Sequence, residues 1–155
     1  LKDTPSFKGE VSLVAKGLGL KTKDTPLLTL AGIFMDKAKN NGSGGVKVGS
    51  LQFSKLDILS SPDIPVNVTI PSITATDIVS SDLKSGAIGR LIIEKPTVLD
   101  GEKKSRLAQV DAITADKIQL NEDISVAVDK ITIDKGSFLQ DKGQDPLATL
   151  GQLTA

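Results

Sequence analysis

The stretch GRLIIEKPTVLD at residues 89–100 decides the fold, because related stretches lie forty residues to either side of it. They are GEVSLVAKGLGL at 9–20, GSLQFSKLDILS at 49–60 and DKITIDKGSFLQ at 129–140. Each stretch carries apolar residues at alternate positions, which is the spacing of a β-strand with one apolar face. The chain is therefore predicted to be all-β and to contain four copies of one unit.

The forty-residue offset holds over the whole chain. Seven columns are apolar in all four copies, more than chance gives for a chain that is 39% apolar. Three of these columns are Val11/Leu51/Leu91/Ile131, Leu13/Phe53/Ile93/Ile133 and Leu18/Ile58/Val98/Phe138. The units run over about 1–40, 41–80, 81–120 and 121–155, and together they form a single predicted repeat domain covering residues 1–155.

The alternation slips by one residue at several dipeptides. These are Gly49-Ser50, Gly89-Arg90 and Asp129-Lys130, where a hairpin turn or a β-bulge is expected. A similar slip at Asp116-Lys117 makes ITADKIQL and VAVDKITI resemble each other. We expect Lys95-Pro96 and Lys135-Gly136 to end one strand and start the next, so that each unit holds three or four short strands. NNGSGG at residues 40–45 is expected to be a loop.

Repeated β units can stack in a line, as a curved open sheet or solenoid, or close into a four-bladed β-propeller. We favour the linear form, because common propellers carry aromatic signatures in every blade and this chain has four Phe and no Trp or Tyr. The alternation predicts one apolar and one solvated face. The sequence predicts no helix to cover the apolar face, which is therefore either an open trough or a core closed by its own side chains.

Composition disfavours several classes of function, although carboxylates, Ser and Lys remain as chemically active groups. The chain has no His and no Cys, which removes the usual general base and the commonest transition-metal ligands. It has 19 Lys and Arg against 19 Asp and Glu, so it lacks the basic surface that gives most nucleic-acid affinity. We predict a non-enzymatic protein without catalytic residues, metal or cofactor, and without a nucleic-acid partner.

An apolar trough has the shape that lipid acyl chains need, so the inward columns supply the candidate contacts. The candidate lipid-binding residues are Leu13, Phe53, Ile93, Ile133, Ile58, Val98 and Phe138. Unpaired edge strands invite association, so flanking repeats or a second copy are further expected partners. Because the chain begins with Leu1 rather than Met, we expect it to be a fragment or a processed product.

Four stretches resemble the repeats of the AsmA-like superfamily of bacterial envelope proteins, which includes TamB and YhdP. They are GRLIIEKPTVLD (89–100), VDKITIDKGSFLQ (128–140), DTPLLTLAGI (24–33) and RLAQVDAITADKI (106–118). The resemblance implies a periplasmic module of a membrane-anchored protein, whose hydrophobic groove guides phospholipid between membranes. The alternative hypothesis is a structural or adhesive repeat spacer of an envelope or extracellular surface protein.

Overall fold

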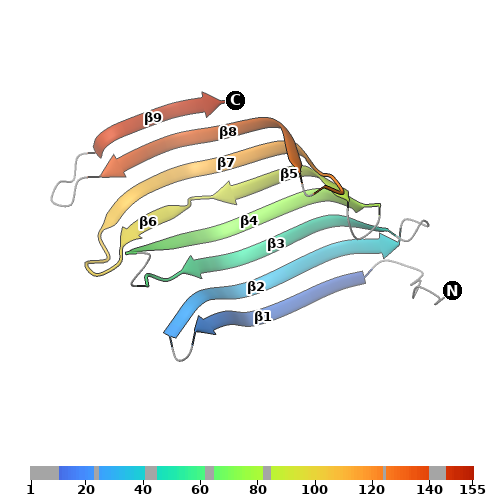
Figure 1. Ribbon diagram of the computed structural model, residues 1–155, viewed down its shortest axis with the longest axis horizontal. Helices are drawn as coiled ribbons and strands as arrows, with labels where there is room; N and C mark the ends of the chain where they lie inside the picture. Colours follow the sequence, from blue (N-terminus) through green and yellow to red (C-terminus); the bar gives the residue numbers. More distant parts are fainter. Residues whose placement is uncertain are drawn as a thin grey trace.

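The computed structural model describes residues 11–22, 25–40, 45–61, 65–81, 85–123, 125–139 and 146–155. Within them the chain forms one antiparallel sheet of nine strands (Figure 1). The strands are β1 (Val11–Thr22), β2 (Thr25–Asn40), β3 (Val46–Ile58), β4 (Val66–Ser80), β5 (Gly86–Glu94), β6 (Thr97–Asp100), β7 (Arg106–Leu120), β8 (Val126–Leu139) and β9 (Pro146–Thr154). The all-β prediction is confirmed. The described part of the chain contains no helix that could cross a membrane.

The strands lie in the sheet in the order in which they follow each other along the chain, from β1 at one edge to β9 at the other. β5 and β6 lie end to end and share one strand position of the sheet, which we call a lane, because both pair with β4 on one side and with β7 on the other. Figure 1 shows a single curved layer, with no second layer of described strands over either face.

In one row across the sheet, successive partners lie twenty residues apart in the chain. The path runs from Phe53 to Ile73, Ile93, Ile113 and Ile133, each paired with the next. One strand and its connection therefore take twenty residues, and forty residues make one hairpin of two long strands.

The prediction of three or four short strands per unit is wrong for three of the four units. The described residues of 1–40, 41–80 and 121–155 hold two strands each, and only 81–120 holds three, because Lys95-Pro96 separates β5 from β6. Gly49-Ser50, Gly89-Arg90 and Asp129-Lys130 lie inside continuous strands, so none of them is a hairpin turn. Lys135-Gly136 likewise does not end β8. In the predicted NNGSGG loop, Asn40 ends β2, and residues 41–44 lie outside the described residues.

The slips in alternation are bends at which one residue takes a left-handed backbone conformation, which is uncommon for residues other than Gly. The first bend line consists of Gly17, Lys55, Lys95 and Lys135, with φ of 68°, 50°, 45° and 45°. The second bend line consists of Lys37, Asp77 and Lys117, with φ of 55°, 54° and 52°. Because the strand registers place the residues of each line level with one another, the bends run across the sheet.

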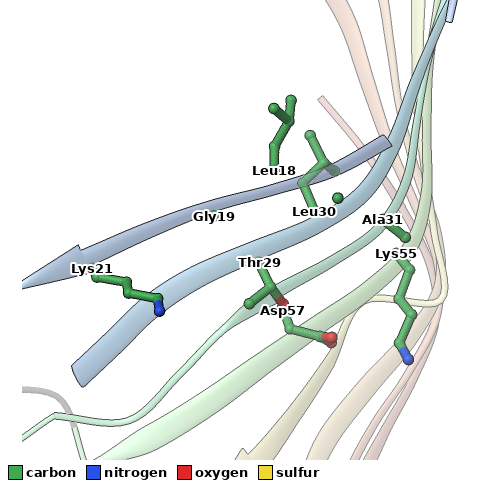
Figure 2. Close-up of a pocket in the computed structure, with 9 residues that line it drawn as sticks. Leu18, Gly19, Lys21, Thr29, Leu30, Ala31, Lys55 and Asp57 are labelled. Atoms are coloured by element: carbon green, nitrogen blue, oxygen red, sulfur yellow. The ribbon is translucent and has the colours of Figure 1, made fainter. Parts of the chain in front are cut away.

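At a bend, two consecutive residues lie on the same face. Along the second line one hollow is lined by four such consecutive pairs, namely Thr76-Asp77, Gly89-Arg90, Asp116-Lys117 and Asp129-Lys130. The alternation then resumes one residue later, so apolar residues before and after each bend share the opposite face, which we call the inner face. Figure 2 shows this at the first line: Leu18 and Leu30 lie inside the bend, whereas Lys55 lies on the outer face.

The single layer leaves few side chains buried. In the described part of the chain the buried apolar residues are Leu30, Ala38, Val48 and Ala75, and no side chain is wholly enclosed. Most domains cover the apolar face of a sheet with a second layer. Here the described residues leave the inner face uncovered.

Candidate apolar binding face

A row of large apolar side chains crosses the inner face between the two bend lines. Its central members are Phe53, Ile73, Ile93, Ile113 and Ile133, each directly opposite the next. Directly opposite side chains pack against each other, and β-branched residues suit this pleated surface. The structure thus brings together three of the predicted contacts, Phe53, Ile93 and Ile133, and places an isoleucine between each two.

A second row lies beyond the first bend line. It contains the predicted residues Ile58, Val98 and Phe138, with Val68 and Ala108 between them. Phe138 exposes 52% of its surface, while Ile58 and Val98 are half-buried. Three further predicted contacts therefore also share one row of the inner face.

Leu13 lies on the inner face but not in the row predicted for it. The forty-residue column placed Leu13 with Phe53, whereas the pairing path across the sheet is Leu13, Met35, Leu51. The repeat alignment therefore misplaces Leu13 by one row. The bend of β1 lies at Gly17, two residues later than a forty-residue spacing from the bend at Lys55 predicts. Leu13 belongs beside the row of Phe53, and it is 52% exposed.

Sequence reasoning missed a further row beyond the second bend line. It consists of Val48, Ile78, Ile88, Ile118 and Val128. The signal that identifies it is the likeness of VAVDKITI to ITADKIQL, because these stretches lie side by side in β8 and β7 and bend at the same line.

The inner face is exposed most strongly toward the edges of the sheet. Twelve large apolar side chains are exposed among the described residues, and only Val14 and Phe34 of these lie on the outer face. The other ten are Leu13, Leu18, Leu20, Val46, Leu120, Val126, Val128, Ile131, Phe138 and Leu153. Together with the half-buried rows between them, these side chains form an apolar surface of the kind that marks binding sites.

The outer face carries the charges of the bends. Arg90 Nε lies 2.6 Å from Asp116 Oδ1, and Lys117 Nζ donates a hydrogen bond of 2.9 Å to Asp129 Oδ2. The hydrogen bond to Asp129 raises the pKa of Lys117 above its ordinary value. Exposed pairs of this kind contribute little stability. No group of three or more metal-ligating side chains occurs in the described ranges.

A shallow hollow at the first bend line is polar on its outer side. Figure 2 shows Lys55 and Asp57 on that side, whereas the side chains of Leu18 and Leu30, which also border the hollow, project toward the inner face. The hollow therefore offers no apolar pocket, and the extended surface for an apolar ligand is the inner face.

The inner face suits long, flexible apolar chains, since its rows are continuous across neighbouring strands and follow the two bends.

No protein-family model, no curated protein and no solved structure matches this chain.

Proposed function

We propose that the chain is a trough module that holds the acyl chains of phospholipid, in a periplasmic, AsmA-like protein that carries lipid between membranes. The observation that supports this proposal best is the uncovered inner face, with its apolar rows between and beyond the bend lines. Burial of apolar surface contributes roughly 25 cal/mol per Å², so several methylene groups lying along these rows bind without any catalytic group or cofactor.

The proposed architecture is a linear, curved open sheet built from four forty-residue units. Two observations support it: the single path of strand order from β1 to β9, and the forty-residue step between matching positions of every second strand, as from Phe53 to Ile93 and Ile133. A propeller divides its strands among separate four-stranded blades, whereas these nine strands share one sheet.

Photochemical cross-linking at Ile93 tests the proposal. A benzophenone amino acid is introduced at Ile93 on the inner face or, as matched control, at Ile92 on the outer face of the same strand. After illumination in a bacterial host and purification, mass spectrometry is expected to find a phospholipid adduct at Ile93 and none at Ile92. An absence of lipid at Ile93, or equal labelling at both sites, would count against the trough.

The periplasmic location rests on the family resemblance alone and has its own test. The protein, expressed in a host with two membranes, is expected to be degraded by protease once the outer membrane is permeabilised, while the inner membrane is intact. Protection under that condition would contradict a periplasmic location without bearing on the trough.

The structural spacer remains the second candidate, and the regular outer face favours it. Thr74, Thr114, Thr132 and Thr154 lie in one row there, together with Ile92. A spacer of this kind would bind a protein or glycan through the outer face and would be purified without lipid, so the cross-linking experiment separates the two candidates.

A further inference from the structure

The two edges of the sheet are open in the described part of the chain. β1 pairs only with β2, and β9 only with β8. Apart from its first residue, Pro146, the sequence PLATLGQLT of β9 has none of the charges or prolines that usually discourage an edge strand from further pairing. Leu20 on β1 and Leu153 on β9 expose 64% and 50% of their surface, so both edges also present apolar side chains.

Left-handed residues alternate with ordinary ones across each bend line. Lys55, with positive φ, faces Ala31 on one side and Pro71 on the other, neither of which has positive φ. Lys135 in turn faces Gly151, whose φ is not positive either. A strand that continues the sheet beyond β9 must therefore place a left-handed residue opposite Gly151.

β1 is a strand of that kind, because its bend residue is Gly17, with a φ of 68°. The nine strands occupy eight lanes, so a ninth lane would run in the same direction as β1 and antiparallel to β9. β1 therefore has both the left-handed residue and the strand direction that the open edge of β9 requires.

Backbone hydrogen bonding agrees with this pairing. Ile131 and Ala155 exchange both of their N–H···O bonds, at 2.8 and 2.9 Å. In antiparallel sheets such pairs alternate with unbonded ones, so Thr154 directs its N–H and C=O away from β8. The same alternation can be followed from strand to strand as far as β1. It directs the N–H and C=O of Val14 away from β2. When Gly151 faces Gly17, Thr154 lies directly opposite Val14, so the free N–H and C=O groups of the two residues can bond to each other.

We infer that β9 of one copy pairs with β1 of the next copy, antiparallel and with Gly151 opposite Gly17. In this register three apolar pairs form on the inner face. They are Leu153 with Ala15, Leu150 with Leu18, and Ala148 with Leu20, the second residue of each pair belonging to the next copy. The contact is head to tail and does not close on itself, so it produces a filament whose inner faces are continuous.

Two-fold pairing does not fit the bend lines. A β9–β9 contact in that register would set two ordinary residues, Gly151 and its symmetry mate, opposite each other. A β1–β1 contact would set two left-handed Gly17 residues together. Neither arrangement occurs at any bend in the described sheet.

Disulfide trapping tests the orientation, because the chain has no cysteine of its own. Leu153→Cys and Ala15→Cys form an unbonded antiparallel pair in the inferred contact, with Cα atoms about 4.5 Å apart, which suits a disulfide. An equimolar mixture of the two variants is expected to give at least tenfold more disulfide heterodimer than a mixture of Thr154→Cys with Ala15→Cys, whose side chains lie on opposite faces. Predominant cross-linking of Leu153→Cys with itself, or equal yields from both mixtures, would overturn the inference.

Sedimentation of the unmodified chain tests the association itself. We expect the mean mass to rise steadily with concentration, without stopping at a dimer. Thr154→Pro removes an N–H that faces away from β8, so it is expected to keep the monomer's circular dichroism spectrum and to abolish the growth in mass. A chain that stays monomeric at every concentration would refute the contact. Neither experiment involves lipid, so failure of the lipid proposal would leave this inference standing, and the reverse also holds.

Discussion

Ile92 and Ile93 are consecutive residues of β5, yet they lie on opposite faces of the sheet. Ile93 pairs with Ile73 and Ile113 on the inner face, and Ile92 pairs with Thr74 and Thr114 on the outer face. Both side chains are half-buried. The two positions therefore separate the contribution of the inner face from the general effect of a substitution in β5.

Ile93→Asp is expected to weaken the binding of a fluorescent fatty acid at least tenfold, because a carboxylate interrupts the apolar row. A tenfold loss corresponds to about 1.4 kcal/mol, less than full burial of one isoleucine side chain contributes. Ile92→Asp is expected to change the affinity by less than about threefold. Fluorescence titration gives both affinities, and thermal unfolding confirms that both variants are folded. Equal losses would show that the inner face is not the ligand surface.

The left-handed conformation of Lys55 inverts the usual order of alanine and glycine. Alanine is disfavoured at positive φ by roughly 1–2 kcal/mol, so Lys55→Gly is expected to be more stable than Lys55→Ala by about 1 kcal/mol. Gln52 is an extended position of the same strand. There Gln52→Ala is expected to be more stable than Gln52→Gly by roughly 0.5–1 kcal/mol. Denaturant unfolding measures all four variants. The same order at both positions would contradict a bend at Lys55.

Asn67 is the buried polar residue of the described core, with 4% exposure. Its side chain accepts a hydrogen bond from the Ser60 N–H at 2.9 Å and donates one to the Asp100 carbonyl at 3.3 Å. Asn67→Ala leaves the Ser60 N–H without this partner and removes one of the hydrogen bonds to the Asp100 carbonyl, which also accepts one from the Lys104 N–H at 3.1 Å. We therefore expect a loss of about 1–3 kcal/mol in the free energy of unfolding. As a control, Asn121→Ala removes an exposed hydrogen bond to Ser125 and is expected to cost about 0.5 kcal/mol or less. Similar losses in both variants would argue against the burial of Asn67.

Asp123, in the connection between β7 and β8, should titrate below its ordinary value of 3.8. The hydroxyl and the backbone N–H of Ser125 both donate to its carboxylate and lower its pKa. Because the folded pKa lies below the unfolded one, the stabilising contribution is fully present above pH 3.8 and is lost as the pH falls through the folded pKa. Carboxyl NMR titration is expected to show a low pKa that rises in Ser125→Ala. An unchanged pKa in that variant would exclude the hydroxyl as its cause.

The inner face could be predicted from the sequence because alternation alone assigns residues to faces. Phe53, Ile93 and Ile133 share a row as expected. The intervening Ile73 and Ile113 are forty residues apart and fall in another column of the repeat. Placing them in the row of Phe53 requires the antiparallel register, which the forty-residue period does not contain.

The bends could not be told from strand ends in the sequence. A bend and a turn both appear as two adjacent polar residues, as at Lys135-Gly136, and what separates them is the backbone φ. Lysine has no marked preference for the left-handed region, so its recurrence at residues 55, 95 and 135 does not reveal the conformation. For the same reason the two-residue displacement of β1, which moves Leu13 by one row, followed only from the position of Gly17.

The forty-residue spacing between every second strand also determines how such a chain can change in length. Duplicating forty residues adds two strands and lengthens the sheet by about 9.5 Å while its cross-section stays the same. Inserting one residue between two bends would instead turn the remaining side chains of that segment to the wrong face. Growth of the molecule is therefore restricted to whole hairpins, and the number of hairpins measures the span that one chain can bridge.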